Sequence, residues 1–200
     1  MAGRDKEFLG ITLSQIEHHI KQQYVPQIAK KQEIEARLIR ADTVFANDTY
    51  CQLRSLKKEL SYSVNSLRLH DYYFENLGNS PVKKPSVVEW LFSRDFGSFD
   101  EWKNEFIALG LCARGWVLTG YDLKEGRVRN FITDNHSEGV WSVVPLLVMD
   151  VYEHAYCPQY SSRQEYVREF LDNVNWILVG HRTAAAIEMH KAYEKVIKEK

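Results

Sequence analysis

An apolar run that ends in an acidic residue constrains the C-terminal half of this sequence more than any other feature. Residues 143–149 are predicted to form a buried strand, Asp150 follows them directly, and His154 comes four residues later. If the chain turns helically after the strand, both side chains face one point, and this pair of ligand types suits a transition metal ion better than calcium or magnesium. The pair alone leaves a second interpretation open, in which Asp150 caps a helix and His154 lies on the surface.

The composition indicates a folded protein with small-molecule or protein partners. The chain has 200 residues, 44% of them hydrophobic, and its 26 basic and 27 acidic residues give a net charge of −1, which offers no argument for nucleic-acid or membrane partners. Its three cysteines are far apart and form no Cys-x-x-Cys motif, which fits a reducing compartment. Residues 1–10 lack the apolar core of a signal peptide, and no segment approaches the length of a membrane span, so we expect a cytoplasmic protein.

The first helical pattern begins near the N-terminus. Thr12 is its candidate N-cap, and His19 lies on or beside its apolar face. Pro26 cannot donate a backbone hydrogen bond and should kink or break the helix, which resumes as a charged amphipathic pattern over residues 27–46. We therefore expect a bent or two-piece helical element.

A second long helix is predicted over residues 47–77, with His70 near its end. A hairpin of the two helices would let His19 and His70 face each other across the seam, which is how a helical pair builds a metal site. Residues 78–85 have the glycine, proline and polar density of a linker, so we expect an N-terminal helical hairpin domain over residues 1–80.

The rest of the chain predicts an α/β domain over residues 86–200. Sequential strands with short connections favour an antiparallel sheet, here with three strands flanked by helices, so the whole chain belongs to the α+β class. The expected strands are residues 115–121, 127–133 and 143–149, and the expected helices are residues 86–94, 96–112, 162–173 and 183–200.

Several segments together resemble one known family. Residues 150–156 (DVYEHAY), followed by Gln159-Tyr160 and by residues 173–176 (NVNW), closely resemble the C-terminal signature of the iron/manganese superoxide dismutases. Residues 70–77 (HDYYFENL) resemble the second-helix motif of that family, and residues 11–19 are similar to its first-helix segment, so the resemblance covers almost the whole chain.

The resemblance implies an α-hairpin domain, an α/β domain and one iron or manganese ion per subunit between them. Carried over position by position, the ligands would be His19, His70, Asp150 and His154, with a solvent molecule in the fifth position. Three neutral imidazoles and one carboxylate suit an ion that changes between two and three positive charges. The adjacent His18 is the alternative first ligand.

The same resemblance implies which side chains surround the metal. Trp116 would wall the pocket, and His136 would stand where the family has an active-site glutamine and would hydrogen-bond the metal-bound solvent. A histidine on a surface loop is the plain alternative for His136.

Two positions on the first helix depart from the family pattern. Gln23 and Gln27 stand four and eight residues after His19, where the family often has a histidine and usually a gateway tyrosine. Since glutamine cannot act as an acid, we expect His136 with ordered water to deliver protons. A shifted register around the following proline would instead leave Tyr24 at the gateway.

A homodimer, or a higher oligomer built from it, is also implied. Glu153 would pair with His154 of the partner subunit, and Tyr156 would join the same interface, as a two-fold axis requires each group only once per chain. The C-terminal helix is longer than the usual ending of the family. It either packs Ile187 and Val196 inward or makes an added contact with a partner.

The leading hypothesis is an active superoxide dismutase with superoxide as its small-molecule substrate and with no nucleic-acid or membrane partner. Two alternatives stay open: a non-enzymatic structural subunit that keeps this fold, and a metal-binding relative with altered redox activity. The complete set of candidate ligands favours the enzyme. The choice between iron and manganese depends on hydrogen bonds around the ligands that the sequence does not specify.

Overall fold

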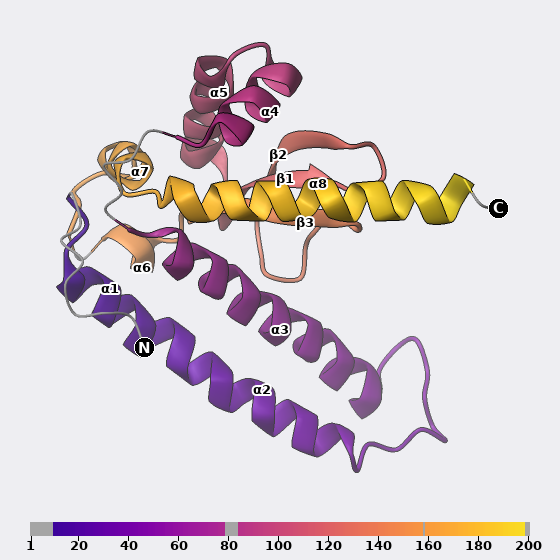
Figure 1. Cartoon of the computed structure of the whole chain (residues 1–200). Helices are drawn as coiled ribbons and strands as arrows, with labels where there is room; N and C mark the ends of the chain where they lie inside the picture. The colour runs from indigo at the N-terminus through magenta and orange to yellow at the C-terminus, as the bar shows by residue number, and fades with distance from the viewer. Residues whose placement is uncertain (1–9, 79–83, 158, 199–200) are drawn as a thin grey trace.

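The computed structural model describes residues 10–78, 84–157 and 159–198. Its N-terminal part is a long helical hairpin (Figure 1). The first arm consists of α1 (Leu13–His19), a π-helical turn η1 (Ile20–Tyr24) and α2 (Val25–Leu38), and the second arm is α3 (Gln52–Asn76).

The first arm starts as predicted but is not broken by its proline. The Thr12 hydroxyl accepts a hydrogen bond from the Gln15 N–H and caps α1. Pro26 lies in the first turn of α2, directly after the π turn, and its fixed φ angle is compatible with a helix. The arm is therefore a continuous helical run with one widened turn, and a break at Pro26 is not observed.

The loop between the two arms is longer than predicted. The helix expected to reach residue 46 ends at Leu38, and the second helix begins at Gln52 and not at residue 47. Short polar side chains explain the difference, because they offer backbone N–H groups a partner outside a helix. Asp42 accepts from the Val44 N–H, and Asn47 accepts from the N–H groups of the second and third residues after it.

The C-terminal part is a three-stranded antiparallel sheet with helices around it, which confirms the predicted α+β class. The strand order is β2-β1-β3, so the first strand of the sequence is central. The limits of β2 are those predicted, and the limits of β1 and β3 differ from the prediction by no more than one residue. The elements are α4 (Ser86–Phe96), α5 (Phe99–Cys112), β1 (Trp116–Asp122), β2 (Arg127–Thr133), β3 (Val143–Asp150), α6 (Glu153–Tyr156), α7 (Arg163–Asp172) and α8 (Trp176–Lys198).

The core lies between the sheet and these helices. The helix pair α4 and α5 and the hairpin lie on opposite sides of the sheet in Figure 1, while α8 runs along its length. Large aromatic side chains fill the core between α5, α7 and β1, and four of the largest fully buried ones are Trp102, Phe106, Trp116 and Phe170. Burial of this much apolar surface fixes the strand ends, and with them the position of Asp150.

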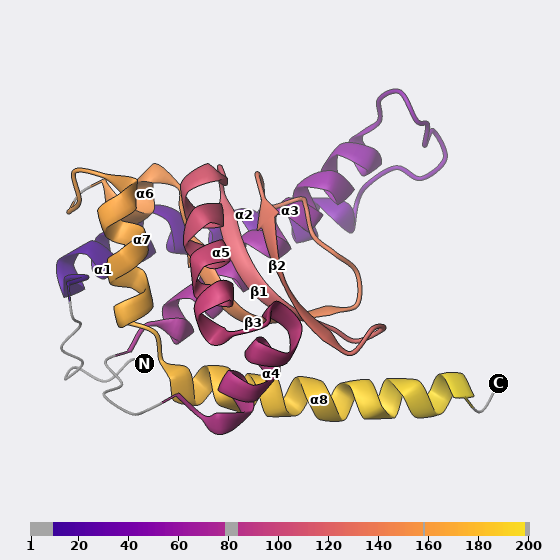
Figure 2. The same cartoon turned by 90° about the horizontal axis from the view of Figure 1, so that it is seen from above.

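The last helix differs from its prediction at the start and at the end. It begins at Trp176, seven residues earlier than expected. Ile187 packs against the core as predicted, but Val196 is 62% exposed, so its predicted burial is wrong. The C-terminal part of α8 extends beyond the other described elements (Figure 2), which leaves this side chain exposed among the described residues.

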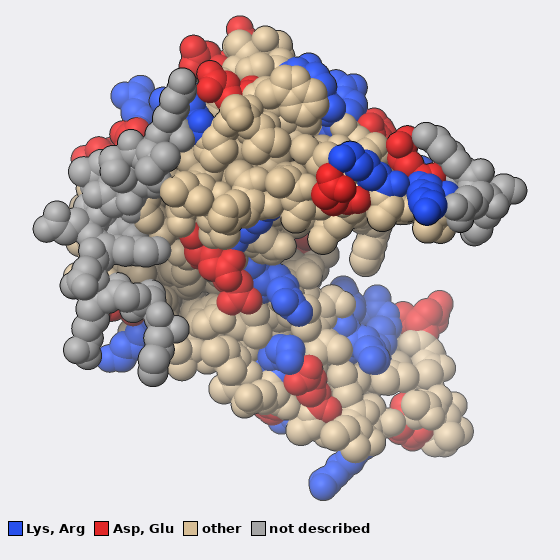
Figure 3. Space-filling model, in the orientation of Figure 1, with Lys and Arg blue, Asp and Glu red and all other residues tan. Residues whose placement is uncertain are grey.

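Some predictions fall outside the described residues. Residues 79–83 of the expected linker and residues 1–9, where we expected no signal peptide, belong to this group. Among the residues that the structure describes, no helix is both long enough and apolar enough to cross a bilayer. On the face drawn in Figure 3, basic and acidic side chains are interspersed.

Candidate metal centre

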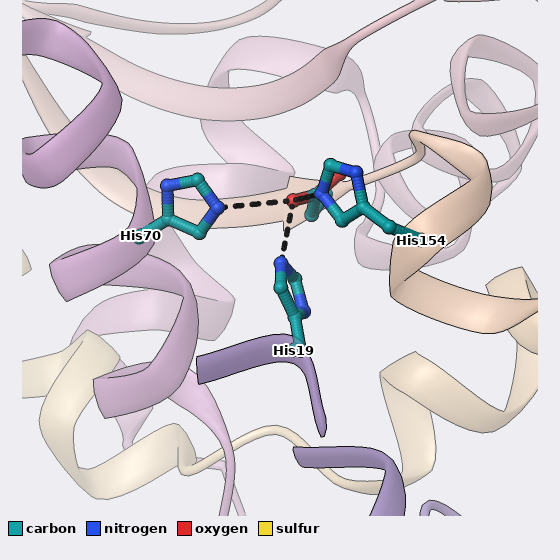
Figure 4. Close-up of side chains that lie close together, drawn as sticks. His19, His70 and His154 are labelled. Carbon is teal, nitrogen blue, oxygen red and sulfur yellow. Dashed lines mark hydrogen bonds and ion pairs between the residues drawn. The ribbon is translucent and has the colours of Figure 1, made fainter. Parts of the chain in front are cut away.

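Four side chains from four separate elements converge between the hairpin and the sheet. His19 is the last residue of α1, His70 lies in α3, Asp150 ends β3 and His154 lies in α6. One possible ligand atom from each lies within 4.8 Å of the others. Figure 4 shows the three imidazoles pointing toward a common centre, where the Asp150 Oδ2 atom lies 3.2, 3.7 and 3.1 Å from Nε2 of His19, His70 and His154.

The carboxylate is positioned by the sheet and by its own backbone. Asp150 is paired with Trp116 of β1, so the register of the sheet fixes its position along the strand. Its Oδ1 accepts a hydrogen bond of 2.9 Å from the Tyr152 N–H, and its backbone carbonyl accepts one of 2.7 Å from the Tyr166 hydroxyl. With Oδ1 engaged in this way, Oδ2 is left to face the imidazoles.

The His70 ring is oriented by its own helix. Its Nδ1 lies 2.7 Å from the carbonyl oxygen of Ser66, one turn earlier in α3. A carbonyl can only accept, so Nδ1 carries the proton and Nε2 presents its lone pair to the cluster. This arrangement, a ring nitrogen that donates to a carbonyl while the other faces the site, is typical of metal-binding histidines.

Burial and hydrogen bonding favour the protonation states that metal binding needs. Burial lowers the pKa of His70 to about 4, so its imidazole is neutral at pH 7. Burial acts to raise the pKa of Asp150, but the hydrogen bond from His154 and the close approach of the His19 imidazole outweigh it and hold that pKa below its ordinary value. The cluster therefore offers a neutral imidazole at His70 and an ionised carboxylate at Asp150, the protonation states in which these groups bind metal.

These residues fit an iron or manganese ion. Ligand atoms at about 2.1 Å from one ion lie roughly 3 to 4 Å from each other, close to the spacing found here. The Nε2 atoms of His19 and His70 are buried and make no hydrogen bond, which is costly unless another group engages them. Imidazoles with a single carboxylate are a donor set that suits iron and related transition metals.

The structure separates the two candidate first ligands. His19 is 1% exposed and lies in the cluster, whereas the adjacent His18 is exposed and lies outside it. Neighbouring helical residues point about 100° apart, so only one of the two can face the hairpin seam.

His136 and Trp116 lie beside the cluster, as the sequence predicted. The His136 ring stacks on Tyr152 with centroids 5.5 Å apart and lies 6.0 Å from the ring of His70. Both of its nitrogens are buried without a hydrogen bond. The Trp116 ring meets His70 edge-on at 4.9 Å.

The π turn changes which residue of the first arm reaches the site. Such a turn contains one residue more than an α-helical turn, and the Tyr24 ring at its end lies 6.2 Å from the ring of His70. The rings of His19 and Tyr24 both contact Phe74, at 5.1 and 5.9 Å. Gln23 is half-buried, and Gln27 has a buried Oε1 without a hydrogen bond.

The Tyr24 hydroxyl is held by a hydrogen bond to an acidic residue of α3. Its hydroxyl donates a hydrogen bond of 2.5 Å to Asp71, the residue after His70. Hydrogen bonding to Asp71, with burial, raises the pKa of Tyr24 to about 12, so it keeps its proton at neutral pH.

Sequence reasoning missed several residues of α3 that shape the site. Ser66 orients His70, Asn65 donates a hydrogen bond of 2.7 Å to the His136 carbonyl, and the Tyr62 ring lies 4.7 Å from that of His136. Only Ser66, four residues before His70, has the spacing of a same-face neighbour and could have been found from the sequence; the contacts of the other two are with His136, which is distant in the sequence.

The two predicted interface residues occupy different environments. Glu153 is exposed. Tyr156 is only 8% exposed, because its ring stacks on Tyr166 of the same chain at 5.5 Å. Of the four cluster side chains, His154 is the most exposed, at 23% against 2% or less for the others.

Comparison with known proteins identifies related sequences over most of the chain. Residues 85–182 match the family model described as iron/manganese superoxide dismutases, C-terminal domain. The superoxide dismutase [Fe] of Aquifex aeolicus is 33% identical over 195 residues, which cover 94% of this chain and 92% of that protein. The superoxide dismutase [Fe] of Cupriavidus metallidurans is 31% identical over 89% of this chain and 91% of its own length. The superoxide dismutase [Mn] 2 of Haloferax volcanii is 34% identical over 60% of this chain and 62% of its own.

Proposed function

The chain belongs to the iron/manganese superoxide dismutase family, and we propose that His19, His70, Asp150 and His154 are its metal ligands. Its activity is superoxide dismutation, in which two superoxide anions and two protons give oxygen and hydrogen peroxide. The single observation that carries the ligand assignment is the convergence of these four buried groups.

The ligands set the charge of the site. When bound, an iron or manganese ion supplies the one-electron change between divalent and trivalent states that dismutation requires. Three imidazoles add no charge and Asp150 adds one negative charge. Trp116 and Phe74 form an apolar wall that excludes bulk water, which strengthens electrostatic attraction inside the pocket.

Proton delivery is assigned to His136 with ordered water. Its two buried nitrogens lack hydrogen bonds, so one can accept a proton while the other donates. The bond from Asn65 to its carbonyl holds the loop in place. Purified His136→Ala is expected to keep its metal and lose turnover by about 100-fold, the lower range for a general acid–base group. Full metal content with full turnover would contradict the assignment.

Gln23 and Gln27 are proposed to line the approach to the site, with Tyr24 as its gateway. The half-burial of both glutamines and the unpaired Oε1 of Gln27 are compatible with groups that relay water. The position of Tyr24 between Asp71 and the Phe74 ring supports its gateway role, which sequence reasoning had as the alternative to Gln27.

A homodimer through Glu153 and Tyr156 is proposed. The partial exposure of His154 supports it, because a partner that covers this face would bury the fourth ligand like the other three. Since most of Tyr156 is buried in its own chain, we assign the larger part of the contact to Glu153. Glu153→Ala should sediment as a monomer at nanomolar concentration and lose metal faster, whereas Glu101→Ala, an exposed control on α5, should stay dimeric. A Glu153→Ala variant that stays dimeric would refute the contact.

Two structural units and a cytoplasmic location complete the proposal. The units are residues 1–80 and 86–200, and the start of the matching family model at residue 85 supports that division. Limited proteolysis of the full chain should first cut within residues 78–85, and a first cut inside the sheet would contradict the division. Cell fractionation tests the compartment.

Purified protein tests the function directly. Reconstitution with iron and with manganese in parallel, followed by elemental analysis and a superoxide assay, should show about one ion per chain and dismutation with at least one metal. Protein that binds no metal would favour the structural subunit, and metal without dismutation would favour a relative with altered redox activity.

A further inference from the structure

Gln15 connects the helix that carries His19 with the short helix that carries His154. It lies in α1, one turn before His19, and is 3% exposed. Its side-chain Nε2 donates two hydrogen bonds, one of 3.0 Å to the carbonyl of His154 and one of 2.8 Å to the carbonyl of Ala155. One amide group thus reaches from the hairpin to the backbone of another proposed ligand.

Those two carbonyls cannot find partners along their own helix. In an α-helix the carbonyl of His154 would accept from residue 158, which is a proline and has no N–H. The carbonyl of Ala155 would accept from Gln159, but the Gln159 N–H bonds to the Tyr156 carbonyl. A buried carbonyl without a donor is unfavourable, so the Gln15 amide supplies what α6 lacks.

A second glutamine ties the same two segments in the opposite direction. Gln159, which follows α6, accepts hydrogen bonds at its Oε1 from the N–H and the hydroxyl of Thr12, at 2.9 and 3.1 Å. The start of α1 is therefore fastened to the end of the α6 segment at two points. In the metal site itself, the ring centroids of His19 and His154 lie 4.7 Å apart.

We propose that Gln15 is a positioning residue of the metal site. Its two hydrogen bonds hold α6 at a fixed distance from α1 and so set the separation of the His19 and His154 imidazoles. The Gln15 Oε1 is buried without a hydrogen bond, so the amide acts through its NH₂ group alone. The inference rests on the proposed ligand set, and it adds to that set a residue that touches neither the ion nor a ligand ring.

Gln15→Met tests this role, because the thioether has a similar length and volume but no donor, and the change also removes the unpaired Oε1. The matched control is Gln22→Met, an exposed glutamine in the π turn. Each protein is loaded with iron or manganese, and release of the ion to a chelator is followed together with the electron paramagnetic resonance and visible spectra. Melting temperatures of the metal-free proteins are measured in parallel.

For Gln15→Met we expect release of the ion to be about tenfold faster, at the lower end of the range for residues that orient metal ligands, with a shifted spectrum. Gln22→Met should match the wild type in both. A Gln15→Met protein with wild-type release and an unchanged spectrum would overturn the inference, whatever its melting temperature, because lost stability alone does not move the spectrum.

If Gln15→Met does not fold, Gln15→Asn applies the same test, since it keeps the amide but is one methylene too short to reach both carbonyls. Wild-type protein that binds no ion would overturn the proposed ligands and this inference together. Wild-type protein with metal, beside Gln15 variants that match it, would overturn the inference alone.

Discussion

The two halves of the metal site are built in different ways. Asp150 and His154 come from one short segment, and a strand end, a turn and a four-residue helix place them. His19 and His70 are 51 residues apart in the sequence and meet only because two long helices pack into a hairpin. Local backbone geometry thus determines one half, and tertiary packing the other, so the hairpin half should be the more sensitive to loss of the ion.

The largest expected loss of metal binding and activity comes from a substitution in the C-terminal half of the metal site. Asp150→Ala removes the one group that lies within ion-pair distance of all three imidazoles, so metal binding and dismutation should both fall by more than about 100-fold, beyond the range for residues around a ligand. Elemental analysis and a superoxide assay measure the two losses. Asp48→Ala, in the exposed hairpin loop, serves as the control. An Asp150→Ala protein with one tightly held ion would refute the ligand set.

The next prediction concerns the hairpin half and its adjacent histidines. His19→Ala should reduce metal affinity by about 100-fold, because it removes a buried ligand, while His18→Ala should leave affinity within about twofold. Competition with a chelator gives both affinities. The reverse order would place His18 in the site and would require a different register for the first arm.

Removing the ion should show the difference in stability between the two halves of the metal site most clearly. A ligand that binds only the folded state adds roughly 4 kcal/mol to the free energy of unfolding when its free concentration is about a thousand times its dissociation constant. For a chain of this size that corresponds to a shift in melting temperature on the order of 10 °C. Amide hydrogen exchange of the metal-free protein should show lost protection in α1, in η1 and at the end of α3. Protection in β1–β3 should persist, and an equal loss in both regions would contradict the difference between the halves.

A smaller effect is expected at the gateway. Tyr24→Phe keeps the ring against Phe74 and removes the hydroxyl that bonds to Asp71. Turnover should fall by about tenfold, below the usual range for a direct acid–base group, with unchanged metal content. Tyr50→Phe, in the exposed hairpin loop, is the control. Equal losses of metal and turnover would mean that Tyr24 supports the structure and not the reaction.

The difference between local backbone geometry and tertiary packing also explains which parts of the structure the sequence could predict. The strands were predicted to within about one residue, because apolar runs and turn residues are local signals, and the segment from Asp150 to His154 carries its ligands in one motif. The hairpin was predicted as a pair of helices, but their limits near Leu38 and Gln52 were not, because the side chain of Asn47 holds a turn where the apolar spacing still suggests a helix.

The π turn marks the limit of counting along a helix. It adds one residue to a turn, so positions counted from His19 at α-helical spacing no longer hold after η1. The residue that ends this turn, Tyr24, donates a hydrogen bond to Asp71 of α3, a partner that lies far away in the sequence and that local spacing does not predict. Gln15 was missed for a related reason, since its partners lie about 140 residues away.

A crystal structure of the metal-loaded protein, with anomalous scattering measured at the iron or manganese edge, tests the central claim most directly. The account predicts one anomalous peak per chain, about 2.1 Å from Nε2 of His19, His70 and His154 and from an Asp150 carboxylate oxygen. A peak bound by His18, or a loaded protein with no peak among these four side chains, would contradict it.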